Sequence, residues 1–320
     1  MKKHLSVLVI GSLSLCIMLS GCIENKPPSV AITASPTAGV TPLTVSFIGN
    51  ATDETGTIES YLWDFGDGNT SQEQNPTHIF TTVGTYNVSL TSTDNGGLSA
   101  IDTVLITVIP THILFSPSAE ADTGEISNET ILYCEKYIIL NDTEISTLAH
   151  NEIYLQFNFS DIPDDIQVDA ATMMMFITDL GFYEKQGYEK GVSYPKFGNS
   201  GYLFIAVYEC NSTSWDSASL NSSNAPSYNR TPVDYQQITS YEGSGENIWI
   251  SWNVTRLLQK IVSNTTKQVS LVITIEPDPY QSGVPLTYGY ASFFSTEGAL
   301  AQGTENYPHL LANFSTRYPG

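Results

Sequence analysis

The sequence predicts an all-β protein that contains two sandwich domains, the second larger than the first. Short runs with alternating apolar residues recur along the chain and are separated by turns rich in Gly, Pro, Asn and Asp. Charged residues make up only 14% of the chain, which is more typical of secreted β-rich domains than of helical cytosolic enzymes. The length of 320 residues is that of about two domains, each able to bury a proper core.

The amino-terminal residues predict an export signal. Two lysines precede an apolar run from Leu5 to Leu19, which is too short to span a membrane comfortably. The run ends at Leu19-Ser20-Gly21-Cys22, which resembles the lipobox of prokaryotic lipoproteins. This resemblance implies that residues 1–21 are removed, that Cys22 carries lipid, and that residues 22–27 tether the protein to the extracellular face of the cell membrane. The alternative is an ordinary signal peptide with an incidental cysteine.

The charge of the chain is strongly negative. Its formal net charge is -21 at pH 7, with 12 basic and 33 acidic residues. Removal of the signal takes away two lysines and no acid, so 10 basic and 33 acidic residues would remain, a charge of -23. Such a field repels phosphate backbones and anionic lipid headgroups, so nucleic acid is not expected as a partner. No cofactor is predicted, although the charge suits divalent cations, and structural calcium is left open.

The stretch Tyr61-Leu62-Trp63-Asp64-Phe65-Gly66-Asp67-Gly68 predicts the central strand of the first domain and the turn that ends it. Its aromatic residues lie two apart, so in a strand they share one face and fill the core, with Trp63 at the centre. Gly66 and Gly68 permit positive φ at little cost, and the Asp67 side chain can accept from backbone N–H groups of the turn. A catalytic pair of Asp64 and Asp67 is the alternative, but neither has a His, Lys or nucleophile beside it.

The remaining strands of the first domain, residues 28–109, follow from the same alternation. They are expected at residues 29–34, 42–47, 58–65, 84–90 and 101–109, with turns at 36–39 and 94–97 and a polar loop at 68–77.

Several short motifs in this span resemble those of the polycystic-kidney-disease (PKD) repeat domain. In family order they are Pro42-Leu43-Thr44-Val45, the aromatic strand with Asp64 to Gly68, Asn75-Pro76-Thr77-His78, Gly84-Thr85-Tyr86 and Asp94-Asn95-Gly96-Gly97. The resemblance implies an immunoglobulin-like β-sandwich that acts as a spacer or interaction module and has no active site.

The second domain is expected to run from residue 112 to 320. Strands are predicted at residues 153–159, 171–178, 202–208, 248–252 and 269–275. One short helix is predicted as well, with Thr255 as its cap and one apolar face made of Leu257, Leu258, Ile261 and Val262. An all-β sandwich with one small helix is the economical fold.

A second set of motifs resembles DNRLRE-type domains, which are jelly-roll-like and include carbohydrate-binding modules and relatives of the disaggregatase repeat region. These are Asn158-Phe159-Ser160-Asp161-Ile162-Pro163, Ala170-Ala171-Thr172-Met173, Thr213-Ser214-Trp215 with the later Pro226, Trp252-Asn253-Val254-Thr255, Ser295-Thr296-Glu297 and Tyr307-Pro308-His309-Leu310-Leu311. The chain departs from the family at Ser222, where Trp is usual, and at Asn253, where Asp is common, so ligand contacts by those side chains are in doubt.

The cysteines predict one disulfide. Cys16 is removed with the signal peptide and Cys22 is modified by lipid, so Cys134 and Cys210 remain as a pair in an oxidising environment. Two separate buried thiols are the alternative. A metal site would require further Cys or His at ligand spacing, and none is nearby.

The segment from Phe182 to Tyr202 contains the predicted ligand-binding residues. It is rich in aromatic rings among Gly and Lys, and it reads as too irregular for an ordinary strand. Aromatic faces with a polar edge suit stacking on sugar rings, and three lysines of the segment would suit acidic sugars. The alternative is that the rings pack the loop onto its own sandwich. The predicted ligand contacts are Tyr183, Tyr188, Tyr194, Phe197 and Tyr202.

Many Asn-x-Ser/Thr sequons fit an exposed protein that can be N-glycosylated, provided that its host glycosylates asparagine. A sequon on a buried strand face, of which Asn158 is the expected case, would be silent. The sequons are at Asn50, Asn69, Asn87, Asn128, Asn141, Asn158, Asn211, Asn221, Asn229, Asn253, Asn264 and Asn313.

Motifs that carry catalysis are absent. The five histidines are scattered, and the sequence has no zinc-protease helix motif, Gly-x-Ser-x-Gly elbow or phosphate-binding glycine loop. No catalytic residue and no metal ligand is therefore predicted. Two carboxylates far apart in the sequence would escape this reading, so an enzyme is kept as an alternative.

These observations favour a non-catalytic, lipid-anchored surface protein. Its first domain would be a spacer that presents a carbohydrate-binding or adhesive jelly roll, with a polysaccharide or glycoprotein as ligand. One alternative is a polysaccharide-degrading surface enzyme, which the disaggregatase resemblance suggests. Another is a protein–protein scaffold of the envelope. The sequence leaves the ligand and the oligomeric state open.

Overall fold

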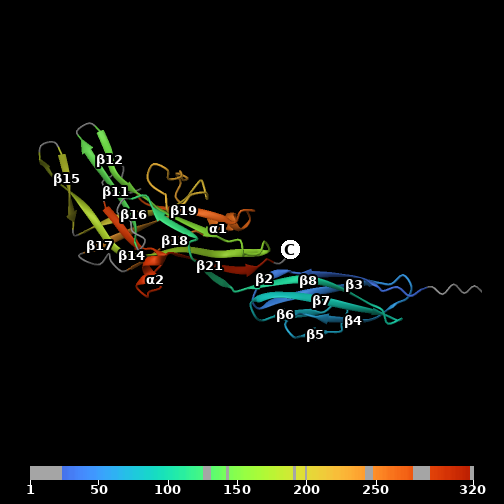
Figure 1. Ribbon diagram of the computed structural model, residues 1–320. Coiled ribbons are helices and arrows are strands. Elements are labelled where there is room, and N and C mark those ends of the chain that lie inside the picture. The colour runs from blue at the N-terminus through green and yellow to red at the C-terminus, as the bar shows by residue number, and fades with distance from the viewer. Residues whose placement is uncertain are drawn as a thin grey trace, which may run out of the picture. The chain divides into compact units, whose positions relative to one another are not determined.

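The computed structural model describes residues 24–124, 131–141, 144–189, 192–198, 200–241, 248–276 and 289–317 (Figure 1). In this part of the chain the regular elements are strands, in four sheets, and two short helices. Backbone contacts divide the chain into two compact units, and their boundary runs through the first sandwich: Phe47–Pro76 and Val88–Val104 belong to one unit, and Ala34–Ser46, Thr77–Asn87 and Leu105–Gly320 to the other. The domain boundary expected at residues 109–112 stays a prediction.

The first sandwich follows the predicted alternation closely. Its strands are β1 Ser29–Ser35, β2 Ala38–Val40, β3 Leu43–Thr52, β4 Ile58–Asp64, β5 Thr70–Ser71, β6 Thr77–Phe80, β7 Gly84–Asp94 and β8 Ser99–Ile109. They form one sheet in the order β1-β3-β6 and another in the order β2-β8-β7-β4-β5. The sequence predicted only a turn where β2 lies and only a loop where β5 lies, because such short strands form through backbone pairing with β8 and β4 and not through their own alternation.

The predicted core strand β4 holds Trp63 in full burial. The exposed fraction of Trp63 is 0%, and its ring centroid lies 5.3 Å from that of Phe47. Its Nε1 donates to the backbone oxygen of Glu73 at 2.9 Å, so burial leaves no unpaired indole N–H.

The turn after β4 is held by two aspartates and two glycines. Asp64 Oδ1 accepts from the N–H of Gly66 at 2.9 Å, and Asp67 Oδ1 accepts from the N–H of Asn69 at 3.0 Å. Gly66 and Gly68 have φ of 76° and 92°, a region that side chains with a Cβ rarely adopt. Both carboxylates are thus engaged in the turn that their residue types favour.

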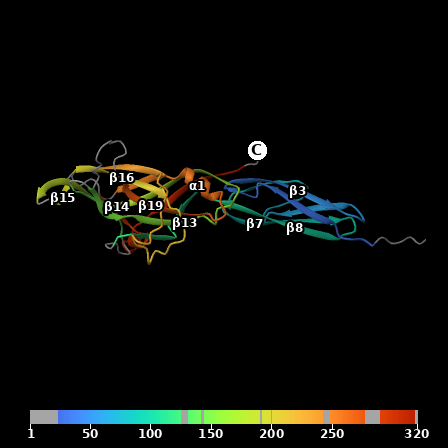
Figure 2. The same cartoon turned by 90° about the horizontal axis from the view of Figure 1, so that it is seen from above.

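The second sandwich is built from one five-stranded and one eight-stranded sheet. Its strands are β9 His112–Phe115, β10 Ala119–Asp122, β11 Ile131–Asn141, β12 Glu144–Asn151, β13 Ile153–Asn158, β14 Ile166–Glu189, β15 Val192–Gly198, β16 Ser200–Glu209, β17 Asp234–Tyr241, β18 Ile248–Asn253, β19 Gln268–Glu276, β20 Gly289–Phe294 and β21 His309–Thr316. One sheet has the order β10-β13-β19-β16-β17, and Figure 2 shows β13, β19 and β16 alongside one another. The other has the order β12-β11-β20-β14-β21-β9, with β15 and β18 also paired to β14.

The core of this sandwich takes inward-facing side chains from both sheets. Leu155 of β13 and Val207 of β16 come from the five-stranded sheet, and Met173 of β14 and Trp252 of β18 from the other. Trp252 is fully buried, and its Nε1 donates to the backbone oxygen of Ile205 at 2.9 Å. The all-β class with a smaller and a larger sandwich is thereby confirmed.

The predicted helix is present as α1, Thr255–Val262, and it buries the predicted residues Leu257, Leu258, Ile261 and Val262. Its predicted cap is wrong. The N-cap is Val254 and makes no side-chain capping bond, because the Thr255 hydroxyl is engaged by the backbone of Ala171 on β14. Asn253 Oδ1 instead accepts from the N–H of Thr255 at 3.0 Å.

A second helix, α2 at Thr296–Ala301, was not predicted. Ser295 caps it by accepting from the N–H of Gly298 at 2.9 Å, and Glu297 lies in its first turn. A capping serine followed by an acidic residue was the available signal, but six residues are too few to show a helical period.

Candidate functional site

The predicted ligand-binding segment forms a β-ribbon. β14 continues to Glu189 and pairs with β15 in antiparallel register, with Tyr183 opposite Phe197. The prediction that this segment is too irregular for a strand was therefore wrong, because pairing within the ribbon supplies the backbone bonds that its composition did not reveal. The side chains of Tyr183, Tyr188, Tyr194, Phe197 and Tyr202 lie outside the described residues.

The predicted disulfide is not formed. Cys134 and Cys210 are both buried, and no disulfide joins them. Cys134 belongs to the core between the sheets, whereas Cys210 packs with Tyr154 and Tyr208 in a separate cluster. Tyr154 alternates with the core residues Ile153 and Leu155, so that cluster lies on the opposite face of the five-stranded sheet. The alternative of two separate buried cysteines describes the structure.

A buried carboxylate organises this outer face. Glu152 is 9% exposed, and it accepts from the hydroxyl of Tyr154 at 2.9 Å and from that of Tyr228 at 2.6 Å. Burial, together with the negative charge of Glu152, raises the pKa of both tyrosines far above the usual value for phenols. We call these three residues the Glu152 cluster.

The loop after β16 covers the same face. Trp215 Nε1 donates to Ser270 Oγ at 2.9 Å, and its ring meets Tyr154 edge-on with centroids 5.9 Å apart. The Tyr154 hydroxyl is also 3.1 Å from the backbone oxygen of Pro226. The Trp215 and Pro226 of the sequence motif therefore fasten a loop to the sheet.

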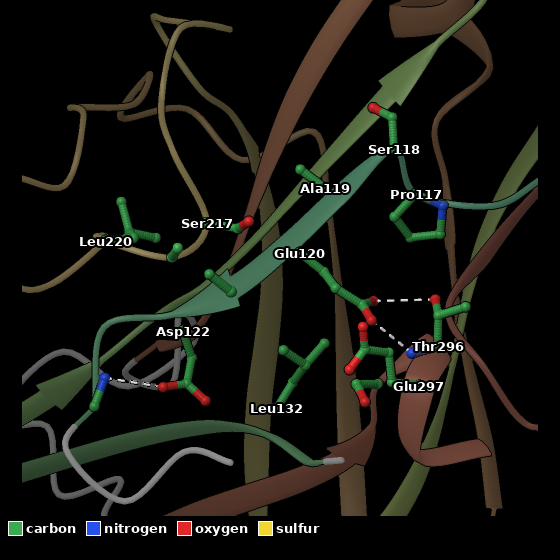
Figure 3. Close-up of a pocket in the computed structure, with 14 residues that line it drawn as sticks. Pro117, Ser118, Ala119, Glu120, Asp122, Leu132, Ser217, Leu220, Thr296 and Glu297 are labelled. Atoms are coloured by element: carbon green, nitrogen blue, oxygen red, sulfur yellow. Dashed lines mark hydrogen bonds between the residues drawn. The ribbon is translucent and has the colours of Figure 1, made fainter. Parts of the chain in front are cut away.

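A hollow lies beside β10 in the described part of the second sandwich and is a candidate binding site (Figure 3). It has a volume of about 740 Å³ and joins four parts of the chain: 117–124 with β10, Leu132 of β11, 217–220 in the loop after β16, and 295–297 at the start of α2. Leu132 and Leu220 contribute apolar surface. We call it the β10 pocket.

Glu120 forms one wall of the β10 pocket. It pairs with Leu155 in the strand register, and its carboxylate accepts from the Thr296 N–H at 2.6 Å and from the Thr296 hydroxyl at 3.2 Å (Figure 3). Burial raises the pKa of the Glu120 carboxyl, and the charge of Glu297 adds to the rise, while the bonds from Thr296 oppose it. The carboxylate is thus fixed in place before any ligand arrives.

The rest of the lining is also acidic or neutral. Asp122 is 5% exposed, and its Oδ1 accepts from the N–H of Gly124 at 2.9 Å. Glu297 is exposed beside Glu120, and none of the lining residues is basic. Such a pocket offers hydrogen-bond acceptors and some apolar surface, which suits hydroxyl or ammonium groups and disfavours anions.

A second oxygen-rich group lies in the first sandwich. Asp53 Oδ1 accepts from the N–H of Thr55 at 2.8 Å, whereas Asp53 Oδ2 is buried and has no hydrogen-bond partner among the described residues. The side-chain amide of Asn25 links Asp94 to Thr55. Its Nδ2 donates to Asp94 Oδ2 at 3.0 Å, and its Oδ1 accepts from the Thr55 hydroxyl at 3.2 Å. We call this set the Asp53 group.

Asp94 is held as a carboxylate. Although burial tends to raise its pKa, hydrogen bonds from the N–H groups of Leu98 and Gly96 and from Asn25 keep the pKa of Asp94 below its usual value. A Cβ at Gly56 would collide with Asn95 Oδ1 and lie 2.7 Å from Asp53 Oδ2, so the backbone at Gly56 packs closely against these two oxygens. Oxygen ligands of this kind suit Ca²⁺. Within the described residues, no three His, Cys, Asp or Glu side chains form a metal-binding set.

The described sequons are all on the surface. Asn158 is exposed, and its side chain accepts from the Ser160 N–H at 3.0 Å, so the expectation that it lies on a buried face was wrong. It occupies the last, outward position of β13. Asn128 and the side chain of Asn141 lie outside the described residues. The exposed sequon asparagines are Asn50, Asn69, Asn87, Asn158, Asn211, Asn221, Asn229, Asn253, Asn264 and Asn313.

Two expectations concern the amino terminus. The signal and Cys22 lie outside the described residues. Among those that are described, no helix is long and apolar enough to cross a membrane.

Comparison with known proteins identifies the first sandwich. Residues 25–108 match the family model described as PKD domain. A microbial collagenase of Vibrio alginolyticus is 41% identical over 86 residues, which cover 27% of this chain and 11% of the collagenase. Collagenase ColQ1 of Bacillus cereus is 42% identical over 86 residues, covering 27% of this chain and 9% of that relative. The chain thus spans only about a tenth of the length of these relatives, within the PKD part.

Two solved structures are also similar to this chain. The PKD1 domain of Vibrio anguillarum Epp is 36% identical and covers 27% of this chain and 99% of its own, with a TM-score of 0.25. A structure of carbohydrate-binding modules from the β-sandwich superfamily is 16% identical and covers 93% of this chain and 100% of its own, with a TM-score of 0.30. The latter values do not assign the second sandwich to a family.

Proposed function

We propose that this protein is a non-catalytic cell-surface protein whose PKD domain is a spacer and whose second sandwich binds carbohydrate in the β10 pocket. The observation that carries the proposal is the pocket itself, a hollow with fixed carboxylate acceptors and apolar patches. Sugars present both hydroxyl donors and apolar C–H faces, so they match this lining. We also propose that the second sandwich is of the DNRLRE type and that lipid on Cys22 anchors the chain.

The decisive experiment is a glycan array probed with the full chain and with Glu297→Gln. This change keeps the shape of an exposed pocket side chain but removes its charge. We expect the parent to bind a defined set of glycans and the variant to bind them about tenfold more weakly, which corresponds to 1.4 kcal/mol. Glu305→Gln, an exposed carboxylate that does not line the pocket, is the matched control.

Two outcomes would contradict the proposal. Equal binding by parent and Glu297→Gln would exclude the pocket as the site. An array without signal, together with a protein that co-purifies with the chain, would support the scaffold alternative.

The enzyme alternative has one supporting observation. A carboxyl group with raised pKa beside a second carboxylate, as in Glu120 and Glu297, is the arrangement that glycosidases use for acid catalysis. Both Glu120 oxygens, however, already accept from Thr296, which fixes the carboxylate at the start of α2 and does not favour proton transfer to a ligand. We expect no new reducing ends when the chain is incubated with any glycan that it binds. Release of reducing ends that Glu120→Gln abolishes would establish the enzyme.

We further propose that the Asp53 group binds a structural calcium ion. The supporting observation is the buried, unpaired Asp53 Oδ2, since an orphaned carboxylate oxygen is costly unless a cation or donor compensates it. Asp53 and Asp94, with the amide oxygens beside them, would hold the ion. Its role would be to join the start of the domain to the turns after β3 and β7.

A further inference from the structure

Aromatic side chains meet on the outer face of the β14–β18–β21 sheet. The ring of Trp249 lies 5.4 Å from that of Phe176 at 72° and 5.0 Å from that of His309 at 66°. Tyr307 continues the group, with its ring 5.8 Å from His309. We call these four residues the aromatic face.

The strand pattern places this group away from the core. Trp249 and Ser251 alternate with the buried Ile250 and Trp252, and the register sets Trp249 opposite Phe176. Trp249 is 38% exposed, whereas Ile250 is 5% exposed and Trp252 fully buried. The outward position of Trp249 therefore follows from pairing that fixes every other residue of β18 inward.

The neighbours hold the rings in one arrangement. Phe176 is 9% exposed and stacks on Phe294 with centroids 6.1 Å apart and planes 6° apart. Both pack with Ala299 of α2, and Tyr307 lies against them. The exposed Trp249 thus rests on a buried support, which reduces the ordering cost of a ligand that stacks on it.

The described polar side chains next to Trp249 belong to His309 and Ser251. His309 Nδ1 is 3.0 Å from the backbone oxygen of Tyr307, which can only accept, so Nδ1 donates to it. Ser251 and Asn253 are exposed on the same side of β18. A chain with a net charge of -21 thus presents here an aromatic surface, none of whose four residues is an acid, a lysine or an arginine.

We propose that the aromatic face is a second binding site, separate from the β10 pocket, and that it binds neutral glycans. The apolar face of a sugar ring would stack on Trp249, and its hydroxyls would bond to His309 and Ser251. A neutral ligand is favoured because none of the four residues of the aromatic face is an acid, a lysine or an arginine, and the net charge of -21 on the chain disfavours an acidic sugar. This site does not depend on whether the pocket binds carbohydrate.

Titration of the full chain with four neutral probes tests the proposal: the hexasaccharides of cellulose, laminarin, mannan and chitin. Of the four tryptophans, Trp63 and Trp252 are fully buried and Trp215 is partly buried in the loop, so a change in tryptophan fluorescence on binding reports mainly Trp249. We expect at least one probe to bind and Trp249→Ala to weaken it about tenfold or more. Trp249→Phe, which keeps a ring, should bind within a few-fold of the parent.

Control measurements distinguish binding at the aromatic face from binding at the β10 pocket and from loss of the fold. Tyr235→Ala removes an aromatic residue that is also 38% exposed but lies on the other sheet, and it should bind as the parent does. Binding at the aromatic face depends on Trp249, whereas binding at the β10 pocket depends on Glu297, so losses at the two sites are distinguishable. Unchanged far-ultraviolet circular dichroism of each variant verifies its fold.

Three results would overturn the proposal. The first is that none of the four probes binds, and the second is that Trp249→Ala binds as tightly as the parent. The third is that the parent self-associates by light scattering and Trp249→Ala is monomeric, which would make the aromatic face an interface between copies.

Discussion

At the residue scale, Trp63 has the clearest energetic role. We expect Trp63→Ala to cost about 3–5 kcal/mol, because it removes a fully buried ring together with the bond to the Glu73 backbone. A domain of this kind has about 5–15 kcal/mol of stability, so the first sandwich should unfold early while the second melts as in the parent. Differential scanning calorimetry of the full chain measures this. Leu62→Ala, which truncates a neighbour that is 47% exposed, is the control and should change little.

If Trp63→Ala left the melting of the first sandwich unchanged and instead abolished binding to a glycan or protein, Trp63 would be a surface contact. That outcome would mean that Trp63 on β4 faces solvent and not the core of the first sandwich.

A second residue-scale prediction concerns the Asp53 group. Calcium at 100 times its dissociation constant should stabilise the first sandwich by about 2.7 kcal/mol, and a chelator should remove that gain. We expect Asp53→Asn to abolish the calcium-dependent shift in melting temperature. Glu54→Gln is the matched control, since its neighbouring side chain is 83% exposed and pairs only with Lys26 in the described structure. Identical melting of the parent in calcium and in chelator would remove the calcium proposal.

At the element scale, the loop after β16 depends on the Glu152 cluster. The pKa of Tyr154 and of Tyr228 is raised by burial and by Glu152, so the folded protein holds these protons more tightly than the unfolded chain, whose value is near 10.0. The contribution of these two tyrosines to the stability of the second sandwich should therefore be constant up to about pH 10 and fall as the pH rises above it.

Thermal melting between pH 8 and pH 11 measures this dependence. Tyr154→Phe and Tyr228→Phe should each reduce the slope above pH 10, because the variant has one fewer proton to lose on unfolding. Tyr235→Phe on β17, for which burial is much less, should keep the slope of the parent. If the stability of the second sandwich did not fall above pH 10, the conclusion that burial and Glu152 raise the pKa of Tyr154 and Tyr228 would be wrong.

Elements also show where sequence reasoning is weak. The apolar period predicted α1 because two turns repeat it, but α2 is too short to show a period and depends on Ser295. The composition of β14 beyond residue 180 reads as irregular, yet the strand continues because β15 and β20 pair with it. Trp249 was the residue that pattern alone could have revealed, since it alternates with two buried residues of β18.

At the scale of the whole molecule, the proposed export signal and the proposed lipid anchor at Cys22 would decide where the protein works. We expect Cys22→Ser to leave the chain without lipid, so that it is released or stays unprocessed. Phase separation in detergent measures the change, with the parent in the detergent phase and the variant in the aqueous phase. Cys210→Ser is the control, since that cysteine is buried in the second sandwich. Unchanged partitioning of Cys22→Ser would make the anchor assignment wrong.

The sequence by itself determined the β class, the PKD domain, the turn after Trp63 and the apolar face of α1, because each depends on residues close together in the chain. Alternation of two, a helical period and glycines at positive φ are local properties. Pairing and packing between distant segments decided the rest. They placed Cys134 and Cys210 in different clusters, gathered Glu120, Ser217 and Thr296 around one pocket, and brought Trp249 and His309 into contact. Those residues are far apart in sequence, and no local period relates them, so only the tertiary structure brings them together.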